Sequence, residues 1–466
     1  MTQSYRQSLS SSNTVAFPRL SAQLLQWTRV LTFLFILALA LWPGYAELRP
    51  FGLPNIAPTR MLSLLLFGIV LITFFLSAEA QALFLKRLRE NGKLLVLLVA
   101  LYAFKGISAL KSAHVGLAVV ELIKLDVLLV FPVFFYALFA LRGREDLRRI
   151  MLLLMLAGFL ISIMALGEWV LKRNLVLSYL PISTPDSQML SGSTGGFRDN
   201  VYRVQGPFAH PLALSEFLSA VLPIGIYLLL LSKNHWTRLL YGFSMVLMCA
   251  AIYLTRSRAG MGAVAFAVGL LFLVLILRWL RGSKNYVAQY LILLQIPALL
   301  CAMALTAYGY RDYFAGHSME EQRSTSLRGQ MLSKGLPLVA QNPIFGMGAG
   351  KGSDAVGIKT GRFTTTIDNY YLLLALDSGL PSTLLFIAVL WLMLATLWRL
   401  GKGRDRERSL MAAVLAVSIL IFALHATIQA LTSVFPILFV LFAMTLVLKE
   451  DAAAAPATAP RGPLNV

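Results

Sequence analysis

A carboxylate and an amide, Asp368 and Asn369, stand directly before an apolar segment that begins at Tyr370. A carboxylate in this position can act as a general base toward a hydroxyl group. The amide can orient the hydroxyl groups of a ligand, or it can cap the helix that follows. We therefore expect a catalytic pair at the start of this apolar segment.

Four arginines offer a second kind of chemistry. Arg256 and Arg258 lie in the six-residue connection 255–260 between two apolar segments, whereas Arg203 and Arg328 lie in longer polar stretches. The planar guanidinium presents paired donors that match a phosphate group. We expect all four to contact a phosphate, although Arg256 and Arg258 could instead reach lipid headgroups.

Histidine and cysteine add little metal chemistry to this set. His210 precedes Pro211 at a helix start, where it either contacts a ligand or caps the helix, and His317 is an alternative base in a polar loop. Both cysteines, Cys249 and Cys301, lie in apolar segments, which argues against a disulfide or a metal site. We expect no metal and no cofactor.

The elements that hold these residues belong to a membrane. Hydrophobic residues make up 58% of the chain and charged residues 13%, with a mean hydropathy of +0.74. About 20 apolar residues cross a bilayer as a helix, and the long unbroken runs exclude an outer-membrane barrel. The sequence predicts an all-α, polytopic integral membrane protein with about twelve transmembrane helices. They lie near 29–43, 60–77, 93–110, 115–141, 149–171, 211–231, 237–254, 260–280, 286–308, 370–398, 409–427 and 429–448.

Lysine and arginine indicate the orientation of these spans. With the N-terminus inside, every short, strongly basic loop falls on the cytoplasmic side. These loops hold Lys86, Arg87, Arg89 and Lys93; Arg142, Arg144, Arg148 and Arg149; Lys233 and Arg238; Arg278, Arg281 and Lys284; and Arg399, Lys402, Arg404, Arg406 and Arg408. The net charge of +20 then reflects topology and anionic lipids, and its dispersal over separate loops argues against nucleic acid as a partner.

The remaining polar sequence divides into two tails and two long external loops. Residues 1–26 and 451–466 are expected to be cytoplasmic tails that flank a membrane-embedded domain, 27–450. The external loops span about 172–210 and 309–369. Long loops in a compact protein are more often functional than not, so we expect the chemistry on the external face.

Four stretches of this chain resemble the superfamily of O-antigen ligases and Wzy-type polysaccharide polymerases. Each is a weak motif alone, but their order and their shared external side make the combination more specific. They are Arg203-Val204-Gln205-Gly206-Pro207-Phe208-Ala209-His210-Pro211; Thr255-Arg256-Ser257-Arg258-Ala259-Gly260; Arg328 with Asn342-Pro343-Ile344-Phe345-Gly346-Met347-Gly348; and Asp368-Asn369 with Gly379.

The resemblance implies a bacterial inner-membrane glycosyltransferase whose active site faces the periplasm. Its donor would be a glycan linked to undecaprenyl diphosphate, its acceptor a glycan or lipid-linked molecule, and its other partners membrane lipids. Arg203, Arg256, Arg258 and Arg328 would bind the diphosphate, Asp368 and Asn369 would be catalytic, and His210 and His317 would be accessory.

Two alternatives remain open at this stage. The ligase pattern has a histidine where Asp368 stands, which favours a polymerase of O-antigen or exopolysaccharide repeats over a ligase that transfers glycan to a lipid A core. A flippase or another transporter is the alternative of a different class, because Glu121, Lys124, Asp126 and Glu168 lie in or near the membrane.

Overall fold

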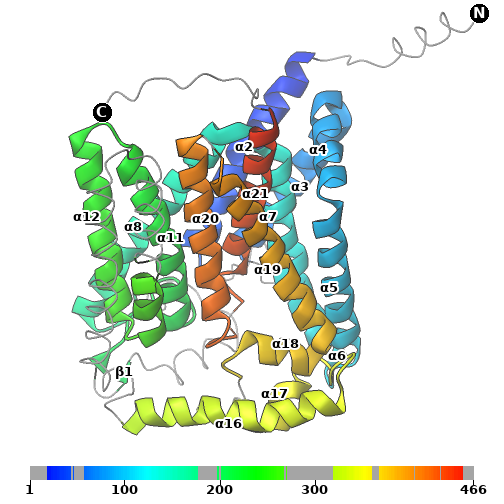
Figure 1. Ribbon diagram of the computed structural model, residues 1–466, viewed down its shortest axis with the longest axis vertical. Helices are drawn as coiled ribbons and strands as arrows, with labels where there is room; N and C mark the ends of the chain where they lie inside the picture. Colours follow the sequence, from blue (N-terminus) through cyan, green and yellow to red (C-terminus); the bar gives the residue numbers. More distant parts are fainter. Residues whose placement is uncertain are drawn as a thin grey trace, which may run out of the picture.

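The computed structural model describes residues 18–43, 46, 57–176, 197–198, 201–266, 269, 319–358, 367–403, 405–430 and 432–454. Most of them form a bundle of upright helices (Figure 1). Eight of the described helices are long and apolar enough to cross a membrane. They are α2 (Pro18–Leu41), α3 (Pro58–Leu76), α5 (Gly92–Leu110), α8 (Gly143–Leu171), α11 (Pro211–Leu231), α12 (His235–Leu254), α19 (Leu380–Gly401) and α20 (Arg406–His425).

The all-α, polytopic membrane fold is thus confirmed, while the count of twelve spans stays a prediction. The predicted span 286–308 and most of 260–280 lie outside the described residues. The predicted fourth span is a continuous series of α6 (Val115–Leu122), the π-helix η1 (Ile123–Val130) and α7 (Phe131–Ala140). Strand in the described chain is limited to the antiparallel pair β1 (Phe197–Arg198) and β2 (Val201–Tyr202).

One predicted span needs correction, and two helices cross the predicted limits of the tails, whose cytoplasmic location stays a prediction. The predicted span 370–398 is two helices, the short α18 (Tyr370–Ser378) and α19, and only α19 is long enough to cross the membrane. Part of the predicted N-terminal tail belongs to α2, which begins at Pro18. At the other end, α21 (Phe435–Ala454) continues past the predicted boundary at 450. In both tails the helix is longer than the apolar run that predicted the span.

The core of the bundle lies around α11, α20 and α21. Residues 435–448 of α21 are buried throughout, because this helix is apolar on every side and other helices surround it. The outer helices turn leucine, valine and phenylalanine outward; Phe75 of α3 is 72% exposed and Val96 of α5 is 68% exposed. Such apolar outer faces suit contact with lipid.

Ion pairs join the basic loops at one end of the bundle. The Arg87 guanidinium lies 2.6 Å from Glu450 at the end of α21. Arg144 pairs with both Asp405, at 2.7 Å, and Asp451, at 2.9 Å. The start of α2, the end of α21 and α4 (Ala78–Glu90) lie at this same end (Figure 1). Loops that were expected to share one side of the membrane therefore do lie together.

A helical layer covers the opposite end. Here α16 (Met319–Gln341) runs across the bundle, with α17 (Lys351–Val356) and α18 beside it (Figure 1). Met331 and Val339 of α16 pack with Val356, Leu372 and Leu376 in a small apolar cluster. The described part of the predicted loop 309–369 is thus largely helix, held to the bundle by its own apolar side chains.

Candidate functional site

The stretch from Arg203 to Pro211, the first of the four motifs, lies against the end of α12. The backbone N–H of Val204 donates to the carbonyl oxygen of Leu254 at 3.3 Å. Arg203 donates from Nε to the carbonyl oxygen of Thr255 at 2.8 Å. The structure therefore brings Arg203 next to the turn that carries Arg256 and Arg258, although more than fifty residues separate them in the sequence.

A buried carboxylate holds this motif in place. Glu168, near the end of α8 and 1% exposed, accepts hydrogen bonds from the Gly206 N–H at 2.8 Å, the Gln205 N–H at 3.2 Å and the Tyr202 hydroxyl at 2.9 Å. The Asn174 amide contributes a longer bond at 3.4 Å. Charge-assisted bonds of this kind are the strong ones. Glu168 thus holds the backbone that follows Arg203 and the Tyr202 side chain that precedes it.

The turn that follows α12 is shaped by close packing. Arg256 has a left-handed backbone with φ 53°, and its guanidinium lies over the Tyr253 ring, 5.0 Å from the centroid. A Cβ added at Gly260 would lie 1.6 Å from Oγ of Ser215. Only glycine lets the helical residues 258–266 approach α11 this closely.

The helical layer connects this turn to the predicted catalytic pair. Arg258 donates from Nη2 to the Thr325 hydroxyl of α16 at 3.2 Å. One helical turn further along α16, Nε of Arg328 lies 3.5 Å from Oδ2 of Asp368. The four arginines and Asp368 therefore follow one continuous line of contacts across the end of the bundle.

Asp368 and Asn369 have different surroundings. Asn369 is the N-cap of α18, where its Oδ1 accepts from the Leu372 N–H at 2.9 Å, so the cap alternative describes Asn369 and not Asp368. Burial raises the pKa of the Asp368 carboxyl, and the Arg328 guanidinium lowers it in part. Asp368 is therefore a half-buried carboxylate held by one cation, a suitable setting for a general base.

A glycine loop sets the position of α18. Gly346 and Gly348 have positive φ angles of 63° and 105°, and an added Cβ would lie 2.5 Å from backbone atoms of Asp377 or Lys111, respectively. The Asp377 carboxylate accepts from the N–H groups of Gly350 and Gly352, each at 3.1 Å. Burial raises the pKa of Asp377 to about 6 against these two bonds. Gly346 permits close backbone packing against the end of α18, and Gly348 permits it against the end of α5.

Comparison with known proteins agrees with this arrangement. A family model described as O-antigen ligase matches residues 243–387. This part of the chain is similar to the O-antigen ligase family. The matched region contains Arg256, Arg258, Arg328, Asp368 and Asn369, while Arg203 and Glu168 precede it. The match bears out the resemblance seen in the motifs and supports an O-antigen ligase or polymerase type of function. A search of curated proteins finds no match.

The structure describes one of the two histidines that were predicted to be accessory, His210, and not the other. Nδ1 of His210 accepts from the Leu212 N–H at 3.1 Å, which makes His210 the N-cap of α11. His317 lies outside the described residues. No group of three or more His, Cys, Asp or Glu side chains within the described ranges is placed to hold a metal ion.

Sequence reasoning missed the role of Glu168. It considered this carboxylate only as an intramembrane charge that would suit a transporter. Glu168 lies thirty-five residues before Arg203. Nothing in the sequence indicates which backbone N–H groups its carboxylate accepts from.

We predict that Glu168→Gln loosens the Arg203 motif. The new NH₂ group cannot accept from the N–H groups of Gln205 and Gly206, so the free energy of unfolding should fall by about 1–3 kcal/mol. Thermal unfolding in detergent and trypsin cleavage at Arg203 measure the two effects. The matched control is Glu145→Gln in the first turn of α8, where the carboxylate is 62% exposed. Equal cleavage rates in both variants would contradict the prediction.

Proposed function

We propose that this protein transfers a glycan from an undecaprenyl-diphosphate-linked donor at the periplasmic face of the bacterial inner membrane, and that it polymerises O-antigen or exopolysaccharide repeat units. The observation that carries the proposal is the ion pair between Arg328 and Asp368. In this pair a candidate base, Asp368, lies beside a candidate phosphate-binding residue, Arg328, at the end of the bundle opposite the basic loops (Figure 1).

In this proposal the arginines bind the donor's diphosphate. Arg203 and Arg258 come from two sides of the turn after α12, so they can hold both phosphates of one diphosphate. Forked guanidinium groups suit that geometry better than lysine does. As the bond to the sugar breaks, the diphosphate gains negative charge, and fixed positive groups stabilise that charge without a metal ion.

Asp368 acts on the acceptor in the same step. Its carboxylate takes the proton of the acceptor hydroxyl, whose oxygen forms the new bond to the anomeric carbon of the donor sugar. The bond from that carbon to the diphosphate oxygen breaks, and the diphosphate leaves with the electron pair. Asn369, whose Oδ1 is used by the cap, orients the acceptor through its side-chain NH₂ group.

A ligase is the second candidate, and the description of the matching family favours it. A ligase would use the same donor chemistry but would deliver the glycan to a lipid A core. Asp368 stands where the ligase pattern has histidine, which supports the polymerase. The two candidates differ only in the acceptor.

Reconstitution tests the function directly. We expect the purified protein in lipid vesicles to join polyprenyl-diphosphate-linked oligosaccharides into longer chains in the presence of EDTA, without nucleotide or an ion gradient. Gel separation of the lipid-linked products measures chain length. Transfer to added lipid A core without chain growth would identify a ligase, and movement of the donor across the vesicle without a new bond would identify a transporter.

The base is tested by Asp368→Asn. This substitution keeps the size of the side chain and removes its basicity, so turnover should fall about 10²–10⁴-fold while donor binding stays close to that of the wild type. Asp354→Asn on α17, an exposed position, is the matched control and should transfer normally. Normal turnover by Asp368→Asn together with an inactive His317→Ala would move the base to His317.

The pH profile tests the role of Arg328. Asp368 must be ionised to accept a proton, and Arg328 lowers the pKa of that carboxyl, which burial raises. In Arg328→Gln the pKa of Asp368 should rise further, so the loss of kcat/KM at acid pH should begin at a higher pH. Arg323→Gln, an exposed position on the same helix, should leave the midpoint unchanged. An acid midpoint that stays constant or moves down in Arg328→Gln would exclude Asp368 as the titrating base.

A further inference from the structure

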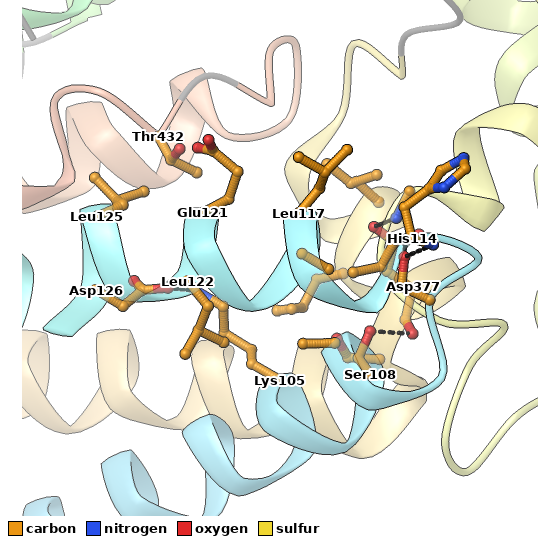
Figure 2. Close-up of a pocket in the computed structure, with 18 of the residues that line it drawn as sticks. Lys105, Ser108, His114, Leu117, Glu121, Leu122, Leu125, Asp126, Asp377 and Thr432 are labelled. Atoms are coloured by element: carbon orange, nitrogen blue, oxygen red, sulfur yellow. Dashed lines mark hydrogen bonds and ion pairs between the residues drawn. The ribbon is translucent and has the colours of Figure 1, made fainter. Parts of the chain in front are cut away.

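A cavity of about 480 Å³ lies beside α18, on the side that faces the bundle. It is bounded by the end of α5, by α6 and the start of η1, and by α18 (Figure 2). Much of its wall is apolar, with Leu117, Leu122 and Leu125 on one side and Leu373 and Leu374 on the other. The volume falls in the range of roughly 300–1,000 Å³ that small-molecule sites occupy.

Charged groups are unevenly distributed around this cavity. One cation, Lys105, and three carboxylates, Glu121, Asp126 and Asp377, line it. Lys105 lies 2.6 Å from Asp126, and the Tyr102 hydroxyl donates to Asp126 at 3.2 Å. Asp377 accepts from two backbone N–H groups. The cation and two of the carboxylates are therefore already engaged.

Glu121 is the carboxylate that remains available. Its side chain projects from α6 toward Thr432 at the edge of the cavity (Figure 2). Among the described residues, none makes a hydrogen bond or an ion pair with it. The next turns of this segment form the π-helix η1, an irregularity that is frequent at functional sites. Glu121 is exposed in the structure, so a ligand that fills the cavity would cover it and would have to supply a hydrogen-bond donor in place of solvent.

The lining separates three classes of ligand. A diphosphate would meet three carboxylates and only one cation, which is already paired. A hydrocarbon chain would suit the leucines but would leave Glu121 without a donor. A saccharide presents hydroxyl donors to carboxylates and its C–H faces to apolar side chains, so it matches both parts of the wall.

We propose that this cavity binds the terminal sugars of the glycan acceptor, with Glu121 accepting hydrogen bonds from their hydroxyl groups. This inference rests on the proposed glycan transfer and adds a binding site for the acceptor. Tyr370, Leu374 and Asp377 of α18 line the cavity, and Asp368 precedes this helix by two residues. A saccharide in the cavity would therefore lead toward Asp368, while Arg328 approaches Asp368 from α16.

A cysteine placed in the wall tests occupancy independently of catalysis. Ala118 lines the cavity, and Val120 on the same helix is 43% exposed and outside the lining. In a protein with Cys249→Ser and Cys301→Ser, we would label Ala118→Cys or the control Val120→Cys with a water-soluble maleimide. The two probes are the oligosaccharide released by mild acid from the cell's own polyprenyl carrier, and polyprenyl monophosphate without sugar.

We expect the oligosaccharide to slow labelling at position 118 and not at position 120, and polyprenyl monophosphate to slow neither. Adding Glu121→Gln should raise the oligosaccharide concentration for half-protection about tenfold or more. In the transfer assay, Glu121→Gln should raise the acceptor KM by a similar factor with little change in donor binding. Protection by polyprenyl monophosphate alone would make the cavity a hydrocarbon site and overturn the proposal, as would no protection by either probe.

Failure of this proposal and failure of the proposed function give different results. If the wild-type protein forms no glycosidic bond but the oligosaccharide still protects position 118, the transfer proposal fails and the saccharide site stands. If transfer proceeds while Glu121→Gln leaves both the acceptor KM and the labelling unchanged, the saccharide site fails and the transfer proposal stands.

Discussion

The close approach of Gly379 to Ile344 determines where α18 ends and therefore where Asp368 lies. A Cβ at Gly379 would be 2.1 Å from the carbonyl oxygen of Ile344, and the Leu380 N–H donates to the neighbouring Pro343 carbonyl at 2.7 Å. This backbone contact breaks what would otherwise be one long helix. The short helix that results can lie against α16 and carry Asp368 to Arg328. The rest of the candidate site depends on that break.

The fold class and the identity of several site residues could be predicted from sequence because they depend on local chemistry. Apolar runs of membrane length predict helices whatever surrounds them, and Asp368-Asn369 stands out as a polar pair before such a run. The break at Gly379 and the function of Glu168 could not be predicted. Both depend on which distant backbone groups lie nearby, Ile344 in one case and Gly206 in the other, and periodicity holds no information about that.

The carboxylates near the end of the bundle that α16 covers differ in the groups that donate hydrogen bonds to them. Glu168 and Asp377 accept from backbone N–H groups, which cannot be displaced without unfolding the local chain. Among the residues that the structure describes, Asp368 forms an ion pair with the side chain of Arg328, and a ligand can compete for a side chain. This difference distinguishes a carboxylate that maintains structure from one that can take part in a reaction.

The position of α21 has a consequence for how the protein is made. This helix is the last described element of the chain, yet it is buried along most of its length and packs against α2, α7, α8 and α20. Synthesis delivers the N-terminal helices first, so they enter the bilayer while the place of α21 is still empty. The ion pairs of Arg87 with Glu450 and of Arg144 with Asp451 likewise form only after the C-terminal partners have been synthesised. The protein can therefore complete its core only after α21 has left the ribosome, and until then the faces of α2, α7, α8 and α20 that it later covers lack this partner.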